Sequence, residues 1–327
     1  MIPLFISRRH TYTVKPFLTT WCPPGTRPLQ LISYQSLHRI ESIRKGPMIF
    51  SDIDRLTPSQ RKLVFSLIET IDEPLRQSLV LNHPQSVMDR ERLLAKLWEG
   101  GWNHYRIHPC AADPGLPLRF PVFIRRIHDH NGPLTPLIHD RRELRNRIHA
   151  LTLAGEQPNR LMIIEYLDTR GADGLFRKYS AFRIGNQIIP GHIIFSRHWV
   201  AKDSPPEPVR EEERQFLHEN PHREALMNIF KEACIEYGRI DYSLRAGKIQ
   251  VWEINTNPVL IYEKYRYARE MLPLKQLLAD RLNEALSETA KNGDNALNPG
   301  GEVQPIRLPL PRSPLLRWDR RLRPVFL

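Results

Sequence analysis

The segment GRIDYSLRAGKIQVWEIN, residues 238–255, constrains the fold of this chain more than any other stretch. Two apolar runs flank the dipeptide Ala246–Gly247, and this pattern predicts two antiparallel strands joined by a tight turn. The same segment carries Asp241, Glu253 and Asn255, which are oxygen-bearing side chains in a run that otherwise favours a buried sheet. We therefore expect a hairpin that also carries a polar site.

The three polar side chains can converge on one point. Glu253 and Asn255 are two residues apart, so both side chains leave the same side of one strand. Asp241 lies on the preceding strand and can face them across the turn. Mg²⁺ prefers oxygen ligands of this kind and completes its shell with water and nucleotide phosphates. The pattern therefore favours a magnesium site over a solvent-facing strand that merely carries polar residues.

Residues 1–82 are expected to form a small α/β domain. Two short apolar runs, GPMIFSDID and SLVLN, each end in polar residues, as buried parallel strands often do. Between them, Thr57, Pro58 and Gln60 predict the capped start of a helix. This order is typical of a strand–helix–strand unit.

Residues 83–290 are expected to form a larger α+β domain. Strands are predicted at RFPVFIRRI and RLMIIEYLDT, and the run RKYSAFRIGNQIIPGHIIF predicts a second hairpin. Helices are predicted after the N-caps Asp89, Asp140 and Asn220, and a last helix is predicted near 274–290. The helix after Asn220 is expected to run as far as Gly238, with Cys234 and Tyr237 on its apolar face.

Residues 291–327 are expected to form an irregular, proline-rich basic tail, because so much proline prevents a regular element. The chain has a formal net charge of +12, and six arginines against Glu302 and Asp319 give residues 300–327 a net charge of +4. A basic balance attracts phosphate groups, whether on a nucleotide, a nucleic acid or a membrane. Charge alone therefore does not identify the partner.

Several classes of protein are disfavoured by the composition. No apolar run approaches the roughly 18 residues that a membrane-spanning helix needs. The start MIPLFISRRH is too short and too quickly interrupted for a secretory signal. Cys22, Cys110 and Cys234 are far apart and include no CxxC pair, so they indicate neither a zinc site nor a disulfide framework. A cytoplasmic protein without membrane contacts is expected.

At the hairpin the chain resembles a known family. GRIDYSLRAGKIQVWEINTNP is similar to the C-terminal metal-binding signature of ATP-grasp enzymes, the superfamily of D-alanine–D-alanine ligase and glutathione synthetase. In that family an Asp, then a Glu and an Asn on the last strand, hold the Mg²⁺ ions that bridge the ATP phosphates. The matching residues are Asp241, Glu253 and Asn255. The resemblance implies an α/β (α+β) ATP-grasp fold, in which two α+β subdomains clasp ATP and a small α/β domain precedes them.

The resemblance extends more weakly over about residues 80–288. RFPVFIRRI resembles the strand that carries a phosphate-binding Lys in the family, and Arg125 occupies that place, with Arg126 as a second possibility. Arginine keeps the charge but is not geometrically equivalent to lysine. HDHNGP follows where a glycine-rich loop is expected, yet it has one glycine, Gly132. RKYSAF resembles the next strand, and its Lys178 is the candidate for a second phosphate contact.

LMIIEYLDT resembles the hinge that lines the adenine pocket in this family. The resemblance implies that Glu165, Tyr166 and Leu167 flank the base and that Asp168 meets the ribose. Apolar contacts combined with a few polar groups are the usual way in which such pockets bind a ligand.

Enzymes of this superfamily generally activate a carboxylate as an acyl phosphate, from which an amine or another nucleophile displaces phosphate. The resemblance therefore implies a ligase that forms a C–N bond, with ATP and Mg²⁺ as cofactors and with small-molecule or peptide carboxylates and amines as substrates. Phosphoryl transfer mainly needs positioning and charge neutralisation, which Arg125 and Lys178 would supply as catalytic residues.

Three alternatives stay open. Some relatives with this fold phosphorylate small molecules, so a phosphotransferase is one alternative. An ATP-binding regulatory protein with weakened turnover is the second, because Arg125 and the poor glycine loop depart from the family pattern. Nucleic-acid binding through the basic tail is the third, and only charge supports it. The sequence indicates neither the identity of the substrates nor the oligomeric state.

Overall fold

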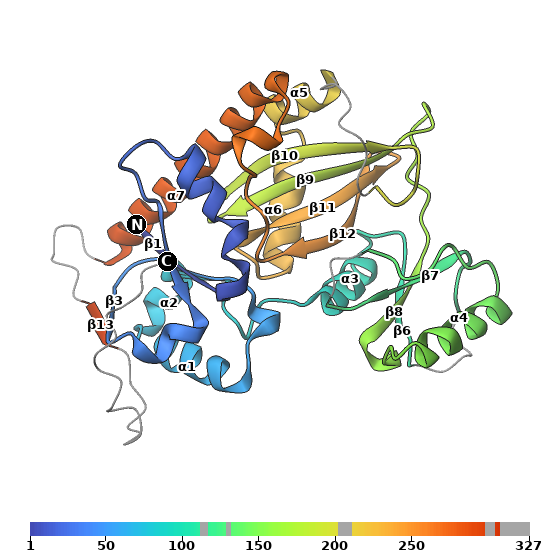
Figure 1. Cartoon of the computed structure of the whole chain (residues 1–327), viewed down its shortest axis with the longest axis horizontal. Coiled ribbons are helices and arrows are strands. Elements are labelled where there is room, and N and C mark those ends of the chain that lie inside the picture. Colours follow the sequence, from blue (N-terminus) through green and yellow to red (C-terminus); the bar gives the residue numbers. More distant parts are fainter. Residues whose placement is uncertain (112–116, 129–131, 202–210, 298–304, 308–327) are drawn as a thin grey trace.

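The computed structural model describes residues 1–111, 117–128, 132–201, 211–297 and 305–307 of the 327-residue chain. Its first unit is a small α/β domain around a parallel four-stranded sheet with the order β2-β1-β4-β5. The strands are β1 (Ile2–Ile6), β2 (Leu29–Ser33), β4 (Met48–Phe50) and β5 (Val80–Leu81). The helices are α1 (Pro58–Glu69) and α2 (Glu73–Leu79). The small domain that we expected is therefore present (Figure 1).

The start of α1 shows why the chain folds as predicted at this point. The Thr57 side chain accepts a hydrogen bond from the backbone N–H of Gln60, and the Gln60 side chain accepts one from the backbone N–H of Thr57. This capping box satisfies backbone donors that the first helical turn leaves free. Helix α2 and its place before β5 were not predicted.

Short 3-10 and π turns also occur between the strands and helices along the whole chain. They are η1 (Arg8–Thr13), η2 (Phe17–Trp21), η3 (Tyr34–Arg39), η4 (Ile53–Arg55), η5 (Pro158–Arg160), η6 (Lys264–Arg266) and η7 (Arg269–Met271).

A second unit consists of a three-stranded antiparallel sheet and two helices. The sheet has the order β6-β8-β7, with β6 (Ile107–Pro109), β7 (Val122–Arg126) and β8 (Leu161–Glu165). Helix α3 (Arg90–Glu99) leads into this unit, and α4 (Arg141–Leu153) packs within it. Both helices begin after the predicted N-caps, because the side chains of Asp89 and Asp140 accept hydrogen bonds from the backbone of the first turn.

The third unit is a four-stranded antiparallel sheet with the order β10-β9-β11-β12. Its strands are β9 (Phe176–Ile184), β10 (Gln187–Ser196), β11 (Tyr237–Arg245) and β12 (Lys248–Asn255), and both predicted hairpins are confirmed. Its helices are α5 (Glu211–Glu219), α6 (Arg223–Glu232) and α7 (Leu272–Leu297). Apolar residues of α5 and α6 cover one face of the sheet, and α7 packs between this sheet and the N-terminal domain.

The predicted start and end of α6 are wrong. Asn220 has a left-handed backbone with φ of 50°, and its side-chain amide donates to the backbone oxygen of Ile188 instead of capping the helix. The helix begins at Arg223 and ends at Glu232. Cys234 follows with φ of 53°, and Tyr237 already belongs to β11. The apolar pattern continued across the turn because residues on both sides of it are buried, Ala233 in the core that covers the four-stranded sheet and Tyr237 in the core that also contains α7.

The expectation of an irregular tail is wrong wherever the tail is described. Helix α7 continues to Leu297, and β13 (Pro305–Arg307) pairs antiparallel with β3 (Ser42–Arg44). Ile306 of β13 is 7% exposed and joins the apolar core of the N-terminal domain. Residues 298–304 and 308–327 lie outside the described residues. The described parts of the tail are therefore regular, and Ile306 and Leu297 pack against the core of the N-terminal domain.

Within the described ranges, no helix combines the length and the apolar character needed to cross a bilayer.

Replacing Ile306 by alanine is expected to destabilise the protein by about 2 kcal/mol, because a buried aliphatic side chain is lost. Urea unfolding measures this change. The matched control is Leu153→Ala, since Leu153 is 76% exposed on α4 and its loss is expected to change little. If Ile306→Ala is as stable as wild type, then β13 does not pack against β3.

Candidate active site

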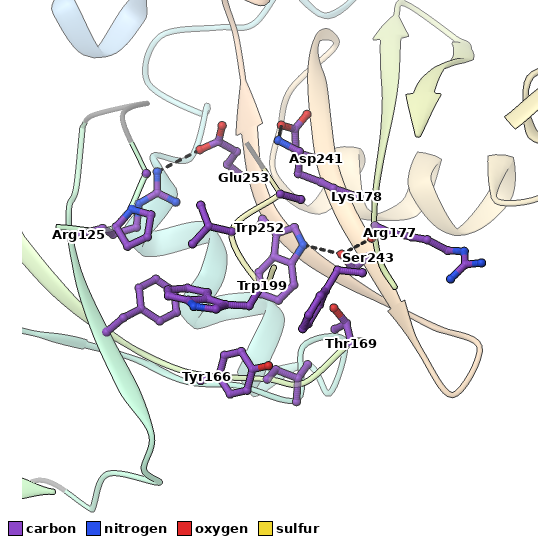
Figure 2. Close-up of a pocket in the computed structure, with 17 residues that line it drawn as sticks. Arg125, Tyr166, Thr169, Arg177, Lys178, Trp199, Asp241, Ser243, Trp252 and Glu253 are labelled. Carbon is purple, nitrogen blue, oxygen red and sulfur yellow. Dashed lines mark hydrogen bonds and ion pairs between the residues drawn. The ribbon is translucent and has the colours of Figure 1, made fainter. Parts of the chain in front are cut away.

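A cavity lies between the three-stranded and four-stranded sheets (Figure 2). Strand β7 contributes Phe123 and Arg125, and the chain after β8 contributes Tyr166 and Leu167. The other wall is formed by residues from the four-stranded sheet, namely Phe176, Arg177, Lys178, Asp241, Ser243, Trp252 and Glu253. Because both units supply the lining, a ligand in this cavity would be held between them.

One end of the cavity is aromatic. The ring of Trp199 lies 4.9 Å from that of Phe123 and meets the ring of Tyr166 edge-on at 5.9 Å. Trp252 stacks on the buried Tyr105 at 5.1 Å, and its Nε1 donates to Ser243 Oγ at 2.9 Å. Aromatic walls of this kind suit a flat, apolar ligand.

Replacing Trp199 by alanine is expected to weaken nucleotide binding about tenfold, because base–aromatic stacking is lost. Calorimetric titration with MgATP measures the effect. Trp98→Ala is the matched control, since Trp98 is 40% exposed on α3 and does not line the cavity. Equal affinities of Trp199→Ala and wild type would show that the aromatic end is not the base site.

The other end of the cavity is charged. Lys178 Nζ lies 3.4 Å from Asp241 Oδ2, and Arg125 Nη2 lies 3.3 Å from Glu253 Oε2 (Figure 2). Asp241 also accepts from Arg239 Nε at 2.9 Å. Glu253 also forms an ion pair with Arg90 of α3. Each carboxylate is therefore shared between two cationic side chains.

A β-bulge places the two carboxylates opposite one another. The β11–β12 ladder is regular from the turn to the pair Tyr242–Val251. If the same register continued, Asp241 would pair with Trp252. The register shifts after Tyr242, so that Asp241 pairs with Glu253 instead. A bulge inserts one extra residue, so the neighbours Trp252 and Glu253 both line the cavity. The predicted approach of the two carboxylates thus depends on this bulge.

The third predicted ligand, Asn255, lies further along the same strand. It follows Glu253 by two residues but lines a second, neighbouring cavity, and its Oδ1 accepts from the backbone N–H of Asn257 at 2.8 Å. The Asn257 amide donates in turn to the buried Asp52 at 3.1 Å, which links this strand end to the N-terminal domain. An amide oxygen has two lone pairs, so Asn255 retains acceptor capacity.

These donors fit a hard divalent cation. In the described part of the chain, no group of three His, Cys, Asp or Glu side chains is arranged to hold a metal. Asp241 and Glu253 nevertheless face each other in register at the cavity wall, and oxygen donors are the ligands that Mg²⁺ prefers. Two carboxylates and one amide leave places for water and phosphate oxygens. The arrangement is therefore an incomplete shell that suits a metal bound together with a nucleotide.

The structure distinguishes the two arginines that were candidates for the phosphate contact. Arg125 lines the cavity, whereas the guanidinium of Arg126 donates to Glu156, with Nε at 2.9 Å from Oε2. Successive side chains of a strand leave opposite faces, so only one of the two can reach a ligand here. Gly132 of the expected glycine-rich loop also lines the cavity, and residues 129–131 lie outside the described residues.

The predicted hinge residues divide into two groups. Tyr166 and Leu167 line the cavity, but the side chains of Glu165 and Asp168 do not. Glu165 is buried and accepts from Arg119 Nε at 2.9 Å. Burial acts to raise its pKa, but the hydrogen bonds from Arg119 and the backbone hold the pKa below its ordinary value. Glu165 therefore connects the end of β8 to the segments before β6 and β7, and it does not line the cavity.

Asp168 is exposed and forms an ion pair with Arg170 at 2.6 Å. Its side chain does not line the cavity, so the predicted ribose contact is not supported by this arrangement.

Two further residues of the site were not predicted, and the sequence left open whether a third, Trp199, faces a ligand. Trp199 and Trp252 form its aromatic end, and Arg90 of α3 reaches Glu253. Trp252 directly precedes Glu253, so its proximity to the site was visible in the sequence, but strict alternation would have placed it on the opposite face. Arg90 and Glu253 are 163 residues apart, and no local pattern connects them.

Comparisons with known proteins agree with this architecture. No family model and no curated protein sequence matches the chain. Among solved structures, D-alanine–D-alanine ligase from Bacillus anthracis complexed with ATP matches with a TM-score of 0.50 and 14% identity, over 89% of this chain and 99% of that chain. A second structure of that ligase matches with a TM-score of 0.52 and 13% identity, over 89% and 97%. The chain has the ATP-grasp fold.

The ATP-grasp fold accounts for the arrangement of the three units. The small α/β domain precedes two α+β units, as the resemblance implied, and the cavity lies between those two units. An L-amino acid ligase from Bacillus licheniformis also matches, with a TM-score of 0.45 and 11% identity over 93% of this chain and 77% of that chain. This weaker likeness adds nothing to the assignment of the fold.

Proposed function

We propose that this ATP-grasp protein is an ATP- and Mg²⁺-dependent ligase that joins a carboxylate to an amine, and that MgATP lies in the cavity between the two sheets. One observation carries the proposal. The cavity has an aromatic end suited to a base, and at its other end it has two facing carboxylates beside basic side chains. The ATP complex of the structurally similar D-alanine–D-alanine ligase supports a nucleotide in this fold.

In this proposal the base lies between Trp199, Tyr166 and Leu167, and the phosphates extend toward Arg125 and Lys178. The two basic side chains neutralise the charge that moves onto the leaving oxygen, which is the main contribution that proteins make to phosphoryl transfer. Arginine can donate two parallel hydrogen bonds to phosphate oxygens, so Arg125 is suited to this role although relatives use lysine.

Asp241 and Glu253, with Asn255 as third donor, would hold Mg²⁺, which when bound supplies charge neutralisation at the phosphates. Before binding, each of these two carboxylates forms ion pairs with two cationic side chains, Asp241 with Lys178 and Arg239, and Glu253 with Arg90 and Arg125. The same cations are then available to phosphate and carboxylate groups when the carboxylates turn to a metal. The excess of positive charge at this end of the cavity suits the phosphate groups of a nucleotide.

The reaction that we propose has two steps. A substrate carboxylate oxygen attacks the γ-phosphorus of ATP, the bond from that phosphorus to the bridging oxygen breaks, and ADP leaves. The nitrogen lone pair of an amine then attacks the acyl carbon, the bond to phosphate breaks, and inorganic phosphate leaves while the nitrogen loses a proton to solvent. Neither step needs a nucleophilic side chain.

Incubation with ATP, Mg²⁺ and a panel of amino acids tests the proposal. Phosphate release that requires both a carboxylate and an amine is the expected result. A phosphorylated product without free phosphate would favour a phosphotransferase instead. MgATP binding without turnover on any combination would favour the regulatory alternative.

A cytoplasmic location remains a prediction from the sequence.

A further inference from the structure

A second cavity borders the candidate active site on the side of the N-terminal domain. Its lining includes Asp54 after β4, Arg61 of α1, Arg90 and Arg92 of α3, and Asn255 and Thr256 at the end of β12. The cavity therefore lies where the N-terminal domain, α3 and the end of β12 meet. None of the functional roles assigned above belongs to this cavity as a whole.

Its position in the N-terminal domain is one where α/β proteins bind ligands. Asp54 lies four residues beyond the last residue of β4, and Pro84 and Gln85, which also line the cavity, follow the end of β5. The two strands are parallel neighbours, so both present their carboxyl ends at this edge. In open α/β sheets, ligands bind in the crevice outside the carboxyl ends of the strands.

Arg90 joins this cavity to the candidate active site. It lines the second cavity, and its guanidinium also forms an ion pair with Glu253, which lines the first. Its Nη1 donates to the backbone oxygen of Ile127 at 2.8 Å, and its side chain is 8% exposed. A group bound beside Arg90 in the second cavity is therefore next to the charged end where the phosphates are proposed to lie.

The charges of the second cavity favour an anion. Its acidic residues already have partners, because Asp54 lies 3.9 Å from Arg55 and Asp89 accepts from the backbone N–H of Arg92 at 2.9 Å. Arg61 donates to the backbone oxygen of Ile53 at 3.3 Å. Over the described ranges, neither Arg61 nor the Arg92 side chain forms an ion pair with a carboxylate.

We propose that the second cavity binds the carboxylate substrate of the ligase, and that this substrate carries a second anionic group. The carboxylate that is to be activated lies at Arg90, and the second anionic group is bound by Arg61 and Arg92. The proposal rests on the ligase function above and specifies its substrate class as a dicarboxylate. Arginine suits this role because its planar fork binds carboxylates with two hydrogen bonds.

Matched acids test the proposal. The probes are succinate and glutarate, compared with the half-amides succinamate and glutaramate, all at equal ionic strength and with a non-hydrolysable MgATP analogue present. Calorimetry of the full chain measures binding. We expect the diacids to bind at least about tenfold more tightly than the half-amides, since a charge-assisted hydrogen bond is lost with the amide.

Variants then assign the preference to the two arginines. In Arg61→Gln and Arg92→Gln the preference for diacids is expected to fall, whereas the exposed neighbour Lys62 serves as the control in Lys62→Gln. The thermal shift caused by MgATP is measured on every variant and is expected to be unchanged. Half-amides that bind as well as diacids, a preference that survives in both variants, or no binding of any diacid would overturn the inference.

The thermal shift separates this inference from the proposed function. If MgATP stabilises wild type while the diacids fail, the nucleotide site stands and only the substrate class is wrong. If MgATP does not stabilise wild type, the proposed function is wrong and the inference falls with it.

Discussion

Replacing Glu253 by glutamine is expected to lower turnover by at least about 100-fold and to remove most of the thermal stabilisation that MgATP gives to wild type. Glutamine keeps the shape of the side chain but loses the charge that a divalent cation needs. Stabilisation by a ligand depends on its affinity for the native state, so weaker binding shows directly in the melting temperature. Thermal unfolding with and without MgATP measures this.

The same variant is expected to be less stable than wild type without any ligand. Repulsion between two carboxylates alone would predict the opposite, but Glu253 is the shared partner of Arg90 and Arg125. The Glu253 side chain is 15% exposed. Removing its negative charge takes away the carboxylate that two largely buried arginines share. The cost is roughly 2–4 kcal/mol, somewhat below that of breaking a fully buried pair.

Glu156→Gln is the matched control for Glu253→Gln. Glu156 pairs with Arg126 outside the cavity, so this variant loses an ion pair but not the site. It is expected to keep the full MgATP shift. A Glu253→Gln protein that also keeps the full shift would remove the metal assignment.

Replacing Arg125 by alanine is expected to weaken MgATP binding about ten- to a hundredfold, because charge-assisted hydrogen bonds to the phosphates are lost. Arg125→Lys is expected to retain much of the affinity, since lysine keeps the positive charge at this position of β7. Calorimetric titration measures both.

Arg126→Ala provides a control on the adjacent residue, whose side chain faces Glu156. It is expected to bind MgATP as wild type does. Nucleotide affinity that falls equally in Arg125→Ala and Arg126→Ala would point to general damage of β7. An unchanged affinity in Arg125→Ala would show that this strand does not contact the phosphates.

The hairpin of β11 and β12 was predictable because alternating apolar residues and the Ala246–Gly247 turn are local signals. The sequence did not determine on which side of its strand each carboxylate lies. The bulge between the pairs of Asp241 and Tyr242 decides that Asp241 faces Glu253, and strict alternation of side chains contains no information about a bulge. The prediction of facing carboxylates came from the hairpin and was supported by the family resemblance, but the bulge on which it depends is visible only in the structure.

Long-range pairing limited the prediction of the site. Glu165 was assigned to the adenine pocket by its place in the hinge, but Arg106 and Arg119 draw its carboxylate to the other side of the strand. These arginines are 59 and 46 residues away in the chain. The same holds for Arg90, which no motif connected with Glu253.

The tail illustrates a different limit. Proline content disfavours helices and central strands, but a strand at the edge of a sheet tolerates Pro305. The three residues of β13 are too few to show a period, and their partner β3 precedes them by more than 250 residues. Sequence patterns therefore predicted most strands and helices of the two larger units, but they gave wrong bounds for α6, did not predict β6 and α5, and missed contacts made by short segments.

Transfer of ¹⁸O tests the proposed reaction most directly. The protein is incubated with ATP, Mg²⁺ and a pool of amino acids and dicarboxylic acids whose carboxyl oxygens are labelled with ¹⁸O, and the released phosphate is analysed by mass spectrometry. Because a carboxylate oxygen stays with the phosphorus when the amine displaces phosphate, we expect one ¹⁸O atom in each phosphate released. Unlabelled phosphate, or a phosphorylated product in place of free phosphate, would contradict the ligase.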